Sequence, residues 1–206
     1  MREPRHVLDR PAPGDIRMVL VAPTHPGNVG AAARAMMNMG LGTLHLVDPA
    51  RPPHDREALL RSAGGLAVLD DGVVLDALAP AVDDCVLVCG LSARNRRVDL
   101  PMLPPREAAP LLLEHARRGP VAVLFGREAS GLTNEELGRC RYRIEIPSNP
   151  DYPSLNLAMA VQVLVYELRL AATGPGRRSV DPARDAWDQP PATAGDVEHL
   201  LEHLER

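Results

Sequence analysis

Residues 18–48, MVLVAPTHPGNVGAAARAMMNMGLGTLHLVD, contain the pattern that decides the fold. The apolar run over 18–23 predicts a strand, the alanine- and methionine-rich stretch over 29–39 predicts a helix, and TLHLVD over 43–48 predicts a second strand. Two strands joined through a helix in this way are typically parallel. The stretch therefore predicts an α/β fold.

The same alternation continues along the chain. Strands that are apolar on both faces belong in a sheet that is covered on both sides. We therefore expect one α/β domain over 16–172, with a largely parallel sheet and helices on both faces. The further predicted strands lie at 85–90, 121–126 and 142–147, and the further predicted helices at 56–63, 75–82, 105–118, 133–140 and 154–171.

The two ends of the chain differ from this domain. We expect a flexible N-terminus over 1–15, a Pro/Gly linker over 173–194 and the start of a helical extension over 195–206, either short or truncated. The sequence HLLEH at 199–203 matches a zinc-peptidase pattern, but no following segment supplies a third ligand. We therefore expect a solvated helix face there and no metal.

Composition limits the class of protein. Hydrophobic residues make up 45% of the 206 residues and charged residues 24%, as in folded globular proteins. The chain starts without an apolar leader, and its longest apolar stretch, 157–166, is too short to span a bilayer. We expect a soluble, cytoplasmic protein that does not bind membranes and whose three cysteines are reduced.

The net charge of −4 is unevenly distributed. Residues 181–206 hold seven acidic residues and two arginines and so carry −5, which leaves +1 for residues 1–180. All 23 basic residues are arginine, whose planar donor fork suits phosphate. Clusters of arginine permit RNA binding, although genome base composition and a solvated surface explain them as well. They lie at Arg94, Arg96 and Arg97, at Arg117 and Arg118, at Arg139, Arg141 and Arg143, and at Arg177 and Arg178.

The turn into the first helix, THPGNVG at 24–30, predicts an anion site. Gly27 and Gly30 let backbone N–H groups at a helix start face an anion, and Arg34 lies one turn further along the same face. The alternative is that the glycines only permit close packing of the helix on the sheet. The stretch is neither G-x-G-x-x-G nor a P-loop, which argues against NAD and ATP as ligands.

A second motif, LFGREASGLTNEEL at 124–137, leads out of a predicted strand. Thr133 and Glu136 form a capping box that starts a helix. The capping box leaves Glu128 unexplained. This carboxylate is either part of a functional site or one partner of a weak surface ion pair with Arg127.

A third motif, IPSNPDYPSLNLAMAVQVLVYELRL at 146–170, joins a strand to a long helix. Ser154 is the predicted N-cap of that helix, and Asn156 lies in the first turn, where it is either functional or solvent-facing. Ala158 and Ala160 suit tight packing against another helix, including one across a dimer interface.

Four motifs together resemble the SPOUT superfamily of RNA ribose methyltransferases, most closely its TrmJ type. They are HPGNVGAAARAMMNMGL, LVCGLSAR, LFGREASGLTNEEL and IPSNPDYPSLNLAMAVQVLVYEL, in the expected order within 16–171. The resemblance implies a C-terminal deep trefoil knot, a homodimer, S-adenosylmethionine as cofactor and no metal. It further implies methylation of a ribose 2'-hydroxyl in tRNA, at position 32 of the anticodon loop, in cytidine or uridine.

The resemblance also implies roles for individual residues of this chain. Arg34 would stabilise the forming alkoxide and hold a phosphate, since a guanidinium holds its proton too strongly to act readily as a base. Leu91 departs from the Thr-Ser-Ala-Arg usual in the TrmJ type. The implied catalytic residues are Asn28, Arg34, Glu128, Ser154 and Asn156, and the implied cofactor-binding residues are Leu91, Ser92, Ala93, Gly126, Ile146, Ser154, Leu155 and Asn156.

Two other functions stay open at this point. A ribosomal RNA ribose target shares the same chemistry. A non-catalytic RNA-binding knotted dimer is the other alternative, and the intact Arg34, Glu128, Ser154 and Asn156 argue against it.

Overall fold

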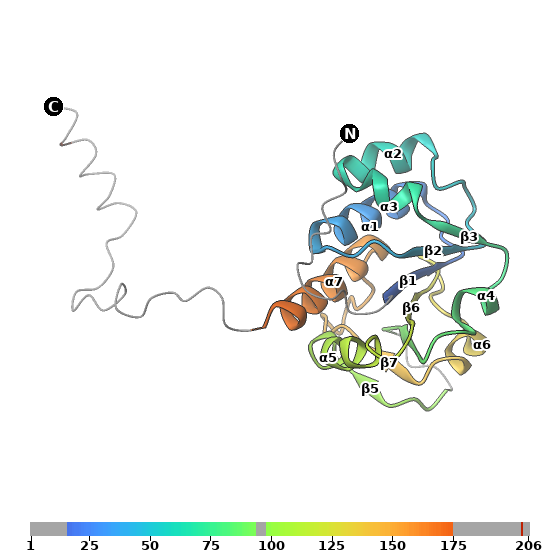
Figure 1. Cartoon of the computed structure of the whole chain (residues 1–206), viewed down its shortest axis with the longest axis vertical. Helices are drawn as coiled ribbons and strands as arrows, with labels where there is room; N and C mark the ends of the chain where they lie inside the picture. Colours follow the sequence, from blue (N-terminus) through green and yellow to red (C-terminus); the bar gives the residue numbers. More distant parts are fainter. Residues whose placement is uncertain (1–15, 94–97, 175–202, 204–206) are drawn as a thin grey trace. The chain divides into compact units, whose positions relative to one another are not determined.

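Parallel strands form the centre of the computed structural model, which describes residues 16–93, 98–174 and 203. Within these residues seven strands form one parallel sheet in the order β3-β2-β1-β6-β4-β7-β5 (Figure 1). The α/β prediction is therefore confirmed. The strands are β1 (Ile16–Val21), β2 (Leu44–Val47), β3 (Val73–Leu75), β4 (Leu87–Leu91), β5 (Met102–Leu103), β6 (Val121–Phe125) and β7 (Tyr142–Ile144).

The opening stretch forms the predicted strand–helix–strand unit. β1 lies beside β2 in parallel register, with Met18 paired to Leu44, and all six β1 residues are buried. A continuous apolar run suits this position because helices cover both faces of the sheet. Helix α1 (Pro26–Met39) begins earlier than the predicted start at 29, since proline fits the first helical position.

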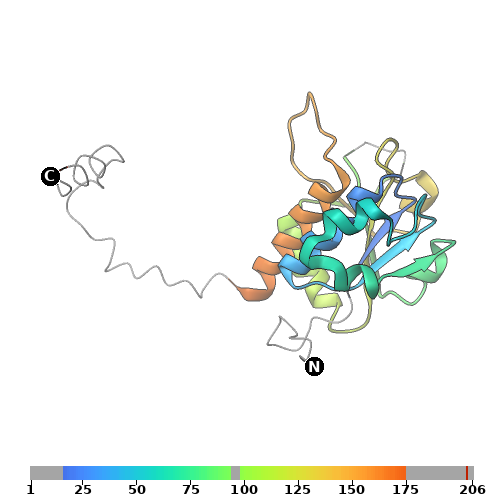
Figure 2. The same cartoon turned by 90° about the horizontal axis from the view of Figure 1, so that it is seen from above.

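Helices cover the two faces of the sheet unequally (Figures 1 and 2). Five helices pack on the face of Met18 and Leu20, whereas α4 and α6 pack on the face of Val19 and Leu124. The helices on the first face are α1, α2 (Arg56–Ser62), α3 (Leu66–Asp70), α5 (Pro105–His115) and α7 (Leu157–Thr173), with a 3-10 turn at Ala63–Gly65, and those on the second are α4 (Ala79–Val82) and α6 (Asn134–Gly138).

Some predicted elements are wrong. The helix expected over 75–82 is helical only in the short α4, because residue 75 ends the edge strand β3, which pairs with β2. Strand β5 and helix α3 were not predicted, since two and five residues are too few to show a periodicity. The helix expected from Ser154 begins only at Leu157.

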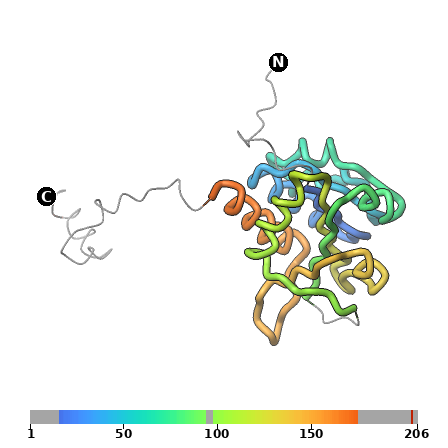
Figure 3. The backbone as a smooth tube through the Cα atoms, turned by 60° about the horizontal axis from the view of Figure 1, so that its bottom comes forward, coloured from blue at the N-terminus to red at the C-terminus, as the bar shows by residue number. Residues whose placement is uncertain are grey.

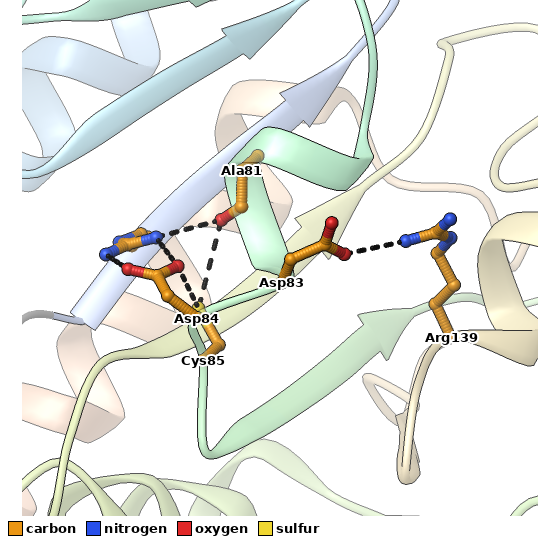
Figure 4. A network of polar contacts seen from close by, with 6 residues as sticks. Ala81, Asp83, Asp84, Cys85 and Arg139 are labelled. Carbon is orange, nitrogen blue, oxygen red and sulfur yellow. Dashed lines mark hydrogen bonds and ion pairs between the residues drawn. The ribbon is translucent and has the colours of Figure 1, made fainter.

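A buried arginine fixes the amino-terminal end of the sheet. Arg17 of β1 is 8% exposed and donates to both Asp84 carboxylate oxygens, at 2.6 and 2.7 Å, and to the Ala81 carbonyl at 3.1 Å. Beside this group, Arg139 donates to Asp83 at 3.0 Å (Figure 4). The contacts tie β1 and the end of α6 to the turn before β4.

The loops at the opposite end of the sheet carry the predicted site. Parallel strands bring their carboxyl ends to one edge, where ligands of open α/β sheets usually bind. The chain leaves β1 at 22–25, β4 at 92–93, β6 at 126–133 and β7 at 145–156. The last of these loops projects from the body of the domain (Figures 2 and 3).

Predictions for the chain ends lie outside the described residues. These are the flexible N-terminus over 1–15, the linker over 173–194 and the extension over 195–206, apart from residues 173, 174 and 203. The HLLEH pattern lies there too, except for His203, which is helical. Arg94, Arg96, Arg97, Arg177 and Arg178 are also outside the described part of the chain.

Candidate active site

The carboxylate of Glu128, in the loop after β6, joins that loop to the start of α1. Its Oε2 accepts hydrogen bonds from the backbone N and hydroxyl of Thr24, at 3.0 and 2.8 Å. Its Oε1 accepts from the backbone N of His25 at 3.2 Å and from Nδ2 of Asn28 at 2.9 Å. The two loops meet because β6 is the sheet neighbour of β1.

Asn28 extends these contacts to helix α7. Its Oδ1 accepts a hydrogen bond from Nδ2 of Asn156 at 2.9 Å, and Oδ1 of Asn156 accepts one from the backbone N of Ala158 at 3.0 Å. The second contact is an N-cap. Asn156 therefore caps α7, and the predicted cap at Ser154 is wrong because Ser154 lies before the first helical turn.

Hydrogen bonds keep Glu128 ionised. Partial burial raises its pKa, but the hydrogen bonds from Asn28 and Thr24 outweigh this effect and lower the pKa from 4.5 to about 2. A carboxylate that accepts four hydrogen bonds and has so low a pKa is a poor proton acceptor near neutral pH. Its hydrogen bonds instead hold the segment from Thr24 to Asn28 in place.

The rest of the loop after β6 is fixed by its own contacts. Thr133 and Glu136 form the predicted capping box, with bonds of 3.1 and 2.7 Å. Arg127 donates to Glu136 at 2.9 and 3.1 Å, so the alternative of an ion pair between Arg127 and Glu128 is wrong. A Cβ at Gly126 would lie 2.2 Å from the backbone of Gly131, which excludes any side chain there.

A cleft of about 570 Å³ lies between α1, α2 and α7, and we call it the arginine cleft. Arg34, Asn28 and Asn156 line it. Arg34 is exposed and has no hydrogen bond or ion pair with any residue that the structure describes. An arginine with its donors available suits a phosphate or a developing negative charge.

A second cleft, of about 320 Å³, lies over the carboxyl ends of β4, β6 and β7, and we call it the loop cleft. Glu128 lines the loop cleft whereas Asn28 lines the arginine cleft, so their hydrogen-bonded chain lies between the two. Of the expected cofactor residues, Asn156 lines the arginine cleft instead. The loop cleft is lined by the other seven, which are Leu91, Ser92, Ala93, Gly126, Ile146, Ser154 and Leu155.

Gly30 serves helix packing. A Cβ at Gly30 would lie 2.0 Å from the carbonyl oxygen of Ala58 in α2. The expected role of Gly30 in facing an anion is therefore wrong, and the close contact is with another helix rather than with the sheet. Gly27 does line the arginine cleft, and a Cβ there would lie 2.9 Å from Oε1 of Glu57.

Sequence reasoning missed two residues of this region. Thr24 donates twice to Glu128, and its position directly after a strand at the carboxyl edge of the sheet was the available signal. Arg61 lines the arginine cleft from α2. No local pattern marks Arg61, because its position depends on how α2 packs on α1.

Two negative findings concern only the described part of the chain. Among residues 16–93, 98–174 and 203, no group of three or more His, Cys, Asp or Glu side chains could hold a metal ion. No helix over the same residues combines the length and apolarity that a membrane span needs.

Known proteins share this fold and much of this sequence. The SpoU rRNA methylase family model matches residues 15–166. The tRNA (cytidine/uridine/adenosine-2'-O-)-methyltransferase TrmJ of Pseudomonas aeruginosa is 49% identical over 205 residues, which cover 97% of this chain and 77% of that protein.

Solved structures agree with this similarity. A probable methylase family protein from Haemophilus influenzae is 43% identical, with a TM-score of 0.73 over 94% of this chain and 78% of that one. The SpoU methyltransferase AviRb of Streptomyces viridochromogenes, solved in complex with the cofactor AdoMet, has a TM-score of 0.61 over 75% of this chain and 59% of that one. At 22% identity, the likeness to AviRb indicates a shared fold.

Proposed function

The chain belongs to the SpoU methylase family and, within it, to the TrmJ tRNA 2'-O-methyltransferases, and on this premise we propose that it methylates a ribose 2'-hydroxyl of tRNA with S-adenosylmethionine. The proposal rests on the residues that line the two clefts. Arg34 lines one cleft, the expected cofactor residues line the other, and the chain Glu128–Asn28–Asn156 lies between them. A cationic cleft beside a small-molecule cleft suits group transfer from a cofactor to an anionic polymer.

The chemistry of the loop cleft fits the cofactor. Leu91, Ile146 and Leu155 offer apolar surface, and Ser154 offers a hydroxyl group. Its volume of about 320 Å³ is near the lower end of the usual range for small-molecule sites. When bound, S-adenosylmethionine supplies a methyl group from its sulfonium sulfur, and this sulfur leaves as part of a neutral thioether. The residues that would hold the cofactor are Leu91, Ser92, Ala93, Gly126, Ile146, Ser154 and Leu155.

The residues of the arginine cleft hold and activate the substrate. Arg34 binds a phosphate and stabilises the alkoxide that forms as the 2'-hydroxyl loses its proton, because a guanidinium is a cation with a planar fork of donors. Asn28 and Asn156 position the hydroxyl for an in-line approach. Glu128 holds Asn28 rather than taking the proton, because its oxygens are already occupied, and the proton of the 2'-hydroxyl passes to water.

We place the target at position 32 of the anticodon loop, in cytidine or uridine, and the protein in the cytoplasm with its tRNA substrate. The Pseudomonas aeruginosa relative, named as a tRNA (cytidine/uridine/adenosine-2'-O-)-methyltransferase, supports tRNA and these nucleosides. The description of the family model, an rRNA methylase family, favours ribosomal RNA as the second candidate.

We also propose a homodimer and a C-terminal knot. An apolar stripe on α7 supports the dimer: Met159, Tyr166 and Leu170 are 63%, 48% and 41% exposed at helical spacing. Strand order supports the knot, since β7 lies between β4 and β5, which both precede it in the sequence. The segment that follows β7 therefore begins between two strands that come earlier in the sequence. A knot requires the chain to pass between earlier segments in this way.

Transfer of radiolabelled methyl groups from S-adenosylmethionine to unmodified tRNA transcripts tests the activity. We expect label on the ribose of nucleotide 32, mapped by nuclease digestion. A transcript with a 2'-deoxynucleotide at that position is the matched control, because it lacks only the acceptor oxygen, and it should accept no label.

Other results would change the proposal. Label on ribosomal RNA fragments but on no tRNA would move the substrate to ribosomal RNA. Absence of label on both, with cofactor binding intact, would contradict the enzyme proposal and favour a binding module.

A further inference from the structure

Two glycines bring α2 against the helix that carries Arg34. A Cβ at Gly30 would lie 2.0 Å from the carbonyl oxygen of Ala58, and a Cβ at Gly65 would lie 2.7 Å from the backbone N of Arg34. Neither position has room for a side chain, so α2 and the turn after it pack directly on α1. This packing brings Arg61, in the last turn of α2, to the arginine cleft.

Among the described residues, the charged side chains that line the arginine cleft are two arginines. Arg34 and Arg61 line it together with His25, and no carboxylate is among the described residues that do so. Two arginines on one cleft suit an anion with more than one binding point. The repeating phosphates of a nucleic acid backbone are such an anion, and phosphate contacts commonly set the register of a bound nucleic acid.

Arg61 is only loosely held by its neighbours. The carboxylate nearest to it is that of Glu57, with Oε1 at 4.0 Å from a guanidinium nitrogen of Arg61 and at 3.9 Å from Nε2 of His25. The Arg61 side chain is 66% exposed, and exposed pairs at such distances contribute little to stability. A phosphate can therefore displace Glu57 from Arg61 at small cost.

We propose that Arg61 binds an RNA backbone phosphate next to the phosphate bound by Arg34, so that α2 forms one wall of the RNA-binding surface. The inference rests on the proposed RNA substrate, but it concerns binding rather than methyl transfer. Glu57 competes with the phosphate for Arg61. Loss of the Arg61 charge should therefore weaken RNA binding, and loss of the Glu57 carboxylate should strengthen it.

Dissociation constants for an unmodified tRNA transcript, measured over a range of salt concentrations, test this inference. Arg61→Gln should raise Kd about ten-fold and reduce the slope of log Kd against log salt by about 0.7 to 0.9, the value for one phosphate contact. Arg61→Lys should restore part of the affinity, since it keeps the charge but loses the donor fork. Glu57→Gln should lower Kd about two-fold, because the competing carboxylate is gone.

Arg118→Gln is the matched control. Arg118 forms the same kind of ion pair as Arg61, with Glu114 four residues earlier at 3.1 Å, but it does not line the cleft. Its variant should keep the wild-type Kd and salt slope. Unfolding temperature and S-adenosylmethionine affinity should be unchanged in Arg61→Gln, which separates loss of a contact from loss of the fold.

Failure of this inference can be told from failure of the proposed function. Methylation of tRNA by the wild type together with an unchanged Kd and salt slope in Arg61→Gln would overturn the inference alone. An equal loss of affinity in Arg118→Gln would also overturn it, because the effect would then be one of overall surface charge. Weaker RNA binding by Arg61→Gln, with no methylation of any tRNA by the wild type, would support the inference and contradict the proposed function.

Discussion

Asn28 and Asn156 are 128 positions apart in the sequence, yet Nδ2 of Asn156 donates a hydrogen bond to Oδ1 of Asn28 at 2.9 Å. Because Asn28 also donates to Glu128, one chain of polar groups runs from the loop after β6 through the start of α1 to the start of α7. This chain lies between the arginine cleft and the loop cleft. A change in any of the three side chains should therefore affect both sides of the site.

The substitution Asn156→Asp keeps the N-cap contact of Asn156 and removes its hydrogen bond to Asn28. Aspartate is as good an N-cap as asparagine, so the free energy of unfolding should change by less than about 0.5 kcal/mol. It cannot donate to Asn28, so kcat/KM for tRNA should fall at least ten-fold. Urea unfolding and methyl-transfer kinetics measure the two effects, and Asn156→Ala, which loses both contacts, should be destabilised by about 1 kcal/mol as well. Wild-type activity in Asn156→Asp would show that the contact with Asn28 is dispensable.

Arg34→Ala should lose turnover but keep the cofactor. Arg34 lines the arginine cleft and not the loop cleft, so the Kd for S-adenosylmethionine, measured by calorimetry, should stay within two-fold of wild type. Loss of a donor that stabilises a forming oxyanion typically lowers kcat by about 10²–10³. Parallel loss of cofactor binding and turnover would instead assign Arg34 a role in folding.

Gly30→Ala should destabilise the protein although alanine favours helices. The new Cβ would lie 2.0 Å from the Ala58 carbonyl oxygen, and overpacking of this kind costs about 1–3 kcal/mol. Gly138→Ala is the control, since that helical position has nothing within 4 Å of a Cβ, and its free energy of unfolding should stay the same or rise by up to about 1 kcal/mol. Equal effects of the two substitutions on urea unfolding would contradict the packing role of Gly30.

The pKa of Glu128 predicts a pH dependence of stability. The pKa is about 2 in the folded protein against an ordinary 4.5, so ionised Glu128 stabilises the fold above about pH 4.5, and this contribution is lost as pH falls toward 2. Glu128→Gln should therefore lower the free energy of unfolding at pH 7, and its difference from wild type should shrink at about pH 3.

Asp84, whose pKa is lowered by its hydrogen bonds from Arg17, is present in both proteins, so its effect cancels in that comparison. Urea unfolding at the two pH values measures the difference between wild type and Glu128→Gln. A difference that does not depend on pH would show that the charge of Glu128 is irrelevant to stability.

Gly126→Ala should weaken cofactor binding. The added Cβ would lie 2.2 Å from the backbone at Gly131 and Leu132, so the loop after β6 has to move, and this loop lines the loop cleft. We expect the Kd for S-adenosylmethionine to rise at least ten-fold, measured by calorimetry, with Gly138→Ala again as the unaffected control. A wild-type Kd in Gly126→Ala would place the cofactor away from this loop.

Local patterns in the sequence were sufficient for part of this structure. The strand–helix–strand unit over 18–48 and the capping box of Thr133 and Glu136 were predicted correctly, because each depends on residues close in the chain. The resemblance to known methyltransferases selected Asn28, Glu128 and Asn156. It did not indicate that these three side chains contact one another.

The sequence by itself determined the α/β class, the segments at the carboxyl edge of the sheet and the family. Only the tertiary structure decided that Asn156 caps α7, that Glu128 is fully occupied by the start of α1, and that Arg61 shares a cleft with Arg34. The physical reason is that strand order and close helix packing bring distant segments to within hydrogen-bonding distance. Such contacts depend on the arrangement of the whole sheet, which no local periodicity or cap signal contains.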